Sequence, residues 1–224
     1  NTKLRAADLR GANLSGANLS QADLSLAKLS GANLSGANLS GVKLITADLN
    51  SADLSSTNLG GADLRRTNLQ QANLSNASLN ESNLVHADLQ NADLSDANLS
   101  GASLQNAKLS GVNLSGANLN RADLRDTKLN HANLRGANLK QANLNNANLC
   151  QANLCQATLN HSNLNHVNLD GANLTQAHLR GASLNYASLR KTNLSYAQLS
   201  HAQLSYGDLS GSELSYAQLR HVDL

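Results

Sequence analysis

The chain has 224 residues, 14% of them charged, and a formal net charge of +2. Residues 1–112 carry 8 basic and 9 acidic side chains and residues 113–224 carry 9 and 6, so neither half is a strong polyelectrolyte. This balance gives no support for a nucleic-acid or membrane partner, and we expect neither. The two cysteines are too few for a disulfide framework.

Leucine occupies residue 4 and every fifth residue through Leu224, which makes 45 consecutive repeats. The residue two positions before each leucine is small, and it is alanine in 32 of the 45 repeats. Between them lies a polar residue, most often Asn or Asp, so the unit reads A-(N/D)-L-x-x. Only Leu26 lies outside this phase.

A period of five is incompatible with a straight helix or a flat strand. Five residues advance an α-helix by about 500°, so the leucines would spread around the whole cylinder. Side chains of a strand alternate with a period of two, so successive leucines would point to opposite faces. All the leucines reach one core only if the chain turns once per repeat, always in the same sense.

Within a repeat, the small residue and the leucine share the inner face, and the Asn or Asp between them points outward. The x-x pair is rich in Ser, Gly and Asn, which favour turns. Longer echoes favour four repeats per coil: GANLSGANLS occurs at 11–20 and 31–40, and SYAQL at 195–199 and 215–219. Both offsets are 20 residues, although other echoes have an offset of five.

These tandem A(D/N)Lxx units resemble the pentapeptide-repeat family over the whole chain. The resemblance implies an all-β fold, a right-handed quadrilateral parallel β-helix of about 20 residues per coil. We therefore expect one uninterrupted domain over residues 1–224, about 11 coils and a rod about 50 Å long, with Leu and Ala in the core. The abundance of such chains in cyanobacteria points to a bacterial source.

Residues 20 positions apart are expected to stack in columns on the surface, and these columns indicate no catalytic, metal or cofactor site. His201 and His221 share a column and are expected about 5 Å apart, but a zinc site needs three or four ligands. Cys150 and Cys155 take equivalent positions on adjacent sides, about 10 Å apart and beyond disulfide reach. An outward Asn column is expected to form a hydrogen-bonded ladder along the rod.

The least regular outward residues define a candidate interaction surface. One corner holds Leu26, Ile45, Arg65, Arg66, Val85, His86, His166, Tyr186 and Tyr206, and the opposite corner holds Tyr196 and Tyr216. Exposed aromatic side chains and arginine are typical of protein contact sites. The alternative is neutral variation of the repeat at these corners.

The hypothesis that fits best is a non-enzymatic scaffold that binds a protein partner, without cofactors. The second hypothesis is a DNA mimic that regulates DNA gyrase, as some pentapeptide-repeat proteins do, but it requires a strongly acidic surface. An ice-binding solenoid would need regular Thr arrays, and the few threonines form none. An enzyme is disfavoured because no motif or inserted loop supplies a site.

The ends of the repeat carry no atypical units that would act as caps. A solenoid with open ends presents unpaired strand edges and bare core. We therefore expect end-to-end self-association through the uncapped coils, or caps outside this sequence; Asn1 in place of Met indicates a processed piece. No run resembles a signal peptide or membrane span, which slightly favours the cytoplasm.

Overall fold

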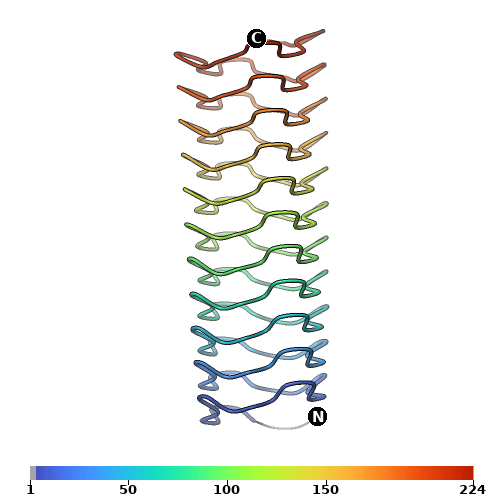
Figure 1. Cartoon of the computed structure of the whole chain (residues 1–224), viewed down its shortest axis with the longest axis vertical. Helices are drawn as coiled ribbons and strands as arrows, with labels where there is room; N and C mark the ends of the chain where they lie inside the picture. Colours follow the sequence, from blue (N-terminus) through green and yellow to red (C-terminus); the bar gives the residue numbers. More distant parts are fainter. Residues whose placement is uncertain (1–3, 224) are drawn as a thin grey trace.

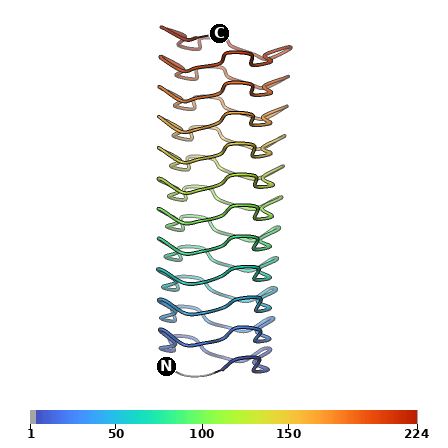
Figure 2. The same cartoon turned by 180° about the vertical axis from the view of Figure 1, so that it is seen from behind.

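The computed structural model describes residues 4–223, which wind into a rod of stacked, closely similar coils (Figure 1). The view from behind shows the same regular stacking on the other side (Figure 2). Parallel bridges join residues 20 positions apart, from Asp8–Lys28 to Gln203–Asp223. One coil therefore takes four pentapeptides, and the fold is the predicted right-handed quadrilateral β-helix.

Neither helices nor longer strands interrupt this pattern between residues 4 and 223. Each side of a coil contributes a single bridge residue, the Asn or Asp position of the repeat, and each corner is a two-residue turn. Within the described part, no helix is long and apolar enough to cross a membrane.

Hydrogen bonds within one repeat explain its sequence. In Ala32–Gly36, Ala32 N–H donates to Leu29 O at 3.0 Å and closes the preceding turn. The N–H groups of residues 33, 34 and 36 donate to carbonyls of the neighbouring coils at 2.7–2.9 Å. The fifth donor, Ser35 N–H, has no backbone acceptor and donates to Asn33 Oδ1 at 3.0 Å. Asn and Asp recur because their side chains accept from the backbone two residues later, which satisfies the last donor.

The corners use a left-handed backbone conformation. The second corner residue has φ between 55° and 69° at all 44 described corners, and glycine occupies only 13 of them. A positive φ at this place, with the hydrogen bond across the turn, is the geometry of a type II turn. Residues other than glycine are strained in this left-handed conformation, so the corners without glycine carry a cost in conformational free energy.

The core consists of the inward leucines and small residues. Side chains from Ala22 to Leu204 at these positions are almost fully buried, with at most 3% exposure. Inward hydroxyls are also satisfied: Thr57 Oγ1 donates to Leu54 O at 2.6 Å, and Thr67 Oγ1 donates to Leu44 O of the previous coil at 2.8 Å. The small hydroxyl residues therefore replace alanine without an unpaired buried group.

The two end coils bury their leucines less completely than the middle. Leu4, Leu9, Leu14 and Leu19 at one end, and Leu209 and Leu214 at the other, are only partly buried. Each described leucine between these coils has a coil above and below it. Hydrophobic stabilisation per leucine is therefore smaller in the end coils, since it scales with the buried apolar area.

Candidate interaction surface

The candidate residues lie mainly along one edge of the rod, here called the first corner. It consists of residues 5 and 6 and the pairs that follow them every 20 residues, up to 205 and 206. The first residue of each pair is partly shielded in several coils, whereas the second projects at positive φ. Large side chains at the second position are therefore exposed to solvent.

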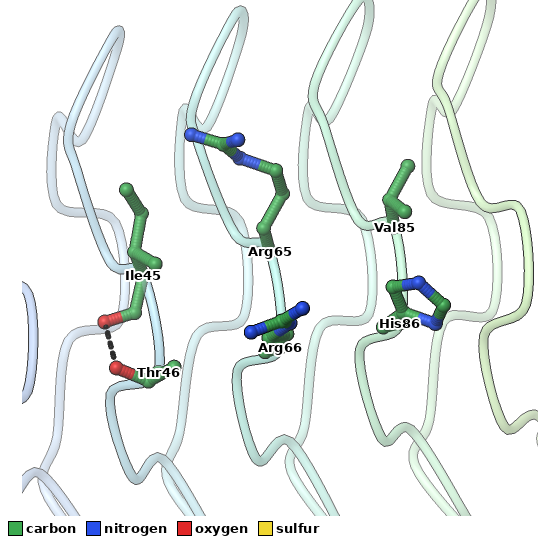
Figure 3. Close-up of a pocket in the computed structure, with 6 residues that line it drawn as sticks. All are labelled: Ile45, Thr46, Arg65, Arg66, Val85 and His86. Atoms are coloured by element: carbon green, nitrogen blue, oxygen red, sulfur yellow. Dashed lines mark hydrogen bonds between the residues drawn. The ribbon is translucent and has the colours of Figure 1, made fainter.

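A shallow open hollow lies on the first corner where three successive coils carry large side chains. Its volume is about 380 Å³, and it is lined by Ile45, Thr46, Arg65, Arg66, Val85 and His86. Figure 3 shows these side chains in two rows, with one pair from each coil. Thr46, which the sequence did not single out, lies in the second row, where its hydroxyl donates to Ile45 O at 2.7 Å.

The two arginines of this hollow differ in whether an aspartate pairs with them. Arg65 folds back onto Asp63 and donates from Nε at 2.8 Å and from Nη2 at 2.7 Å. These hydrogen bonds lower the pKa of Asp63 below its ordinary value. Arg66 has no ion pair among the described residues, so its charge is not neutralised within the rod.

A stack of three rings occupies the C-terminal part of the first corner. His166 and Tyr186 lie 5.0 Å apart between ring centroids, and Tyr186 and Tyr206 lie 4.9 Å apart, with planes within 8°. The tyrosines are 54% and 79% exposed. Ring edges and phenol hydroxyls are therefore accessible along this stretch.

The candidate residues do not form one continuous patch. Asn106, Asp126 and Asn146 occupy the second corner position between His86 and His166. Tyr196 and Tyr216 form their own stack, with centroids 4.9 Å apart, on the diagonally opposite corner. The surface predicted from the sequence therefore divides into three parts: the hollow, the ring stack of the first corner, and the separate tyrosine pair. Leu26 lies on the first corner one coil before the hollow, and its side chain is 47% exposed.

Other expected features of the surface lie where the columns placed them. His201 and His221 stack at 5.0 Å, and both cysteines are free. Asn113 Nδ2 donates to Asp93 Oδ1 at 2.9 Å, one rung of the predicted ladder. Within residues 4–223, no three His, Cys, Asp or Glu side chains are grouped closely enough to hold a metal ion.

The chain belongs to the pentapeptide-repeat family. The model of the family described as pentapeptide repeats matches in 8 copies, over residues 2–41, 32–71, 47–84, 57–96, 97–136, 137–176, 172–206 and 192–224. None of the curated proteins matches the chain significantly.

Several solved structures resemble the chain. HetL, a pentapeptide-repeat protein involved in heterocyst differentiation regulation from the cyanobacterium Nostoc sp. strain PCC 7120, is 37% identical; the match covers 92% of this chain and 88% of HetL, with a TM-score of 0.47. A trypsin-treated form of QnrB1, a plasmid-mediated fluoroquinolone resistance protein, is 20% identical over 85% of this chain and 89% of QnrB1, with a TM-score of 0.58. Rfr23 from the cyanobacterium Cyanothece 51142 is 27% identical over 54% of this chain and 90% of Rfr23, with a TM-score of 0.35.

Proposed function

We propose that this chain is a non-enzymatic scaffold that binds a protein partner at the first corner. The observation that carries the proposal is the hollow, where apolar Ile45 and Val85 flank the unpaired Arg66 on an otherwise polar rod. Apolar side chains beside an accessible arginine are typical of the centres of protein interfaces. The exposed ring stack lies further along the same edge, beyond Asn106, Asp126 and Asn146, and supports a second contact region.

The electrostatics of the carboxylates support a non-enzymatic role. A general acid needs a carboxyl group whose pKa is raised toward neutrality, commonly by a poorly hydrated site. Here the pKa values move the other way: hydrogen bonds from Arg65 lower the pKa of Asp63, and hydrogen bonds from Arg190 lower the pKa of Asp170. These groups serve as ion-pair partners on an open surface.

The repeat supplies substitutions for testing this proposal. Ile45→Ser, Arg66→Asn and Val85→Ser together install residue types that already occupy the same column, such as Ser25 and Asn106. Arg135→Ser with Thr175→Ser makes a matched control on another corner, where serine is the commonest residue. A photo-crosslinking residue in place of Asp126, on the first corner, then captures partners in host cells and mass spectrometry identifies them.

We expect the parent and the control to capture the same protein and the corner variant to lose it, with circular dichroism unchanged in all three. If the corner variant retains every captured protein, the first corner is not the binding surface. Replacing Tyr186 and Tyr206 by Asn then asks whether the ring stack contributes separately.

A gyrase-directed DNA mimic is less well supported. The likeness to QnrB1, at 20% identity, speaks for the fold alone. Such a mimic needs a continuous acidic surface, whereas arginine neutralises Asp63, Asp123 and Asp170 here. A gyrase supercoiling assay with the purified chain tests it: potent inhibition favours the mimic, and no effect favours the scaffold.

We also propose that the 224-residue chain by itself associates end to end. Its end coils leave leucines such as Leu14 and Leu214 only partly buried. Exposed apolar surface favours stacking of a second rod. Sedimentation equilibrium should show larger species as concentration rises, and a strict monomer at high concentration contradicts this proposal.

A further inference from the structure

A different corner of the rod carries a basic residue in each of six successive coils. This corner consists of residues 120 and 121 and the pairs that follow them every 20 residues, up to 220 and 221. Its basic members are Arg121, Lys140, His161, Arg180, His201, Arg220 and His221. We call this set the basic ridge; His178 lies beside it on an adjoining side.

The permanent charges of the basic ridge are not neutralised within the rod. Three arginines elsewhere, Arg10, Arg65 and Arg125, pair with an aspartate two residues earlier, as Arg125 does with Asp123 at 2.7 Å. Before Lys140, Arg180 and Arg220 the corresponding residues are Asn, His and Gln. None of these three cations has an ion pair among residues 4–223.

Few carboxylates surround the basic ridge. Between residues 118 and 221, the corner and the side that precedes it contain no Asp or Glu. The side that follows contributes Asp123, which pairs with Arg125, and Asp223 in the last coil, which accepts from Ser205 Oγ at 3.2 Å and has no ion pair among residues 4–223. The ridge is therefore a strip of one sign of charge on a rod whose net charge is only +2.

The C-terminal part of the ridge is also hollowed. An open depression of about 330 Å³ is lined by Arg180, Arg220 and the stacked rings of His201 and His221, together with neighbouring polar side chains. Arg180, Arg220 and the two histidines therefore border the same open space. Such a depression can receive the side chains of a segment that lies along the ridge.

We propose that the basic ridge binds an extended acidic segment of a partner protein. Arg180 and Arg220 lie two coils apart, about 9.6 Å at the usual spacing of neighbouring strands. In a polyproline II segment, side chains three residues apart are separated by about 9.3 Å. Carboxylates at every third residue of such a segment match the cations along the ridge.

Two features favour an acidic polypeptide over nucleic acid. Proteins that bind single strands add aromatic side chains on which bases stack, and this corner carries no Tyr, Phe or Trp. The strip is also only one corner wide, and no coil in it carries more than one permanent positive charge. This inference does not rest on the first-corner proposal, because the two surfaces share no residue.

The test measures binding of a fluorescein-labelled peptide with about five Glu-Pro-Pro units by fluorescence anisotropy. The ridge variant carries Arg121→Gln, Lys140→Asn, Arg180→Asn and Arg220→Asn, each a residue type already found in that column. The control variant removes the same charge elsewhere: Arg10→Ser, Lys28→Asn, Arg135→Ser and Arg190→Ser. Both variants have a net charge of −2, which is +2 minus 4.

We expect the peptide to bind the parent and the control alike and the ridge variant at least about 10-fold more weakly, since an exposed ion pair contributes up to about fivefold. Added salt should weaken binding to the parent. Circular dichroism checks folding, and a variant with Arg180→Lys and Arg220→Lys should keep the affinity.

Three results would overturn the proposal. The first is no measurable binding of the peptide to the parent at low salt. The second is an equal loss of affinity in the ridge and control variants, which would make the interaction a matter of net charge. The third is tighter binding of oligothymidylate, or of phosphatidylserine vesicles, than of the peptide, which would assign the ridge to another anionic partner. None of these results bears on the first corner.

Discussion

The outward Asn of the repeat should stabilise the rod through one backbone hydrogen bond, and Asn163 isolates that bond. Its Oδ1 accepts from Asn165 N–H at 3.1 Å, and both residues are half-buried. Asn163→Ala leaves this N–H without its acceptor, which should cost about 1 kcal/mol. Asn163→Asp keeps the acceptor and should be nearly neutral. Urea unfolding gives the two stabilities, and hydrogen exchange at Asn165 N–H should become about fivefold faster in the Ala variant alone.

The comparison of the two variants separates the hydrogen bond from other effects of the substitution. Both change the same side chain on the same side of the rod, where the neighbours Asn143 and Ser183 carry no charge. If Asn163→Asp loses as much stability as Asn163→Ala, the side-chain acceptor does not explain the recurrence of Asn and Asp. Equal stability of the Ala variant and the parent would refute the reasoning as well.

Three further perturbations test other parts of the fold. Leu114→Ala, in the fully buried core, should cost roughly 2–5 kcal/mol in urea unfolding, and Leu14→Ala, in a partly exposed end coil, clearly less; equal costs would contradict the role of burial. Gly136→Ala should lower the midpoint of thermal unfolding through a cost of about 1 kcal/mol, because φ is 67° there and a Cβ would meet nothing within 4 Å; an unchanged midpoint would contradict this. Acid should destabilise the rod through carboxylates such as Asp8, whose pKa falls from 3.8 to about 2 because Arg10 donates to it. A lowered folded-state pKa gives stability that is complete above about pH 4 and lost as the pH falls toward 2, so the midpoint should drop in that window, and a flat profile would contradict the ion pairs.

The sequence predicted the architecture because the period is strict. A five-residue leucine period requires one turn per repeat, and the 20-residue echoes predicted the coil that the bridges from Asp8 to Asp223 confirm. The role of the bridge residue was only half predicted. The ladder from Asn113 to Asp93 was expected. The hydrogen bond that Asn163 Oδ1 accepts from Asn165 N–H was missed, although the recurrence of Asn and Asp two residues before this N–H is a signal for it.

The sequence predicted which surface residues lie in the same column, but it predicted fewer of the contacts between their side chains. The stack of His201 on His221 is confirmed at 5.0 Å. The pairing of Arg65 with Asp63 was missed, although the recurring Asp-Leu-Arg triplet at 8–10, 63–65 and 123–125 is a signal for it. The basic ridge was not predicted from the net charge of the chain. Positive and negative charges that balance over the whole chain can still lie in different columns of the surface.

Every surface described above depends on residues 20 positions apart being neighbours, and disulfide trapping measures this directly. With Cys150 and Cys155 replaced by Ser, one variant carries Asn106→Cys and Asp126→Cys, which are 20 residues apart on one corner. A second carries Asn106→Cys and Arg121→Cys, which are 15 apart on adjacent corners. Disulfides need Cα atoms about 4.4–6.8 Å apart, and neighbouring parallel strands provide about 4.8 Å. Mild oxidation should therefore crosslink the first pair within the monomer and leave the second reduced; crosslinking of the second pair, or failure of the first, would contradict the four-sided coil.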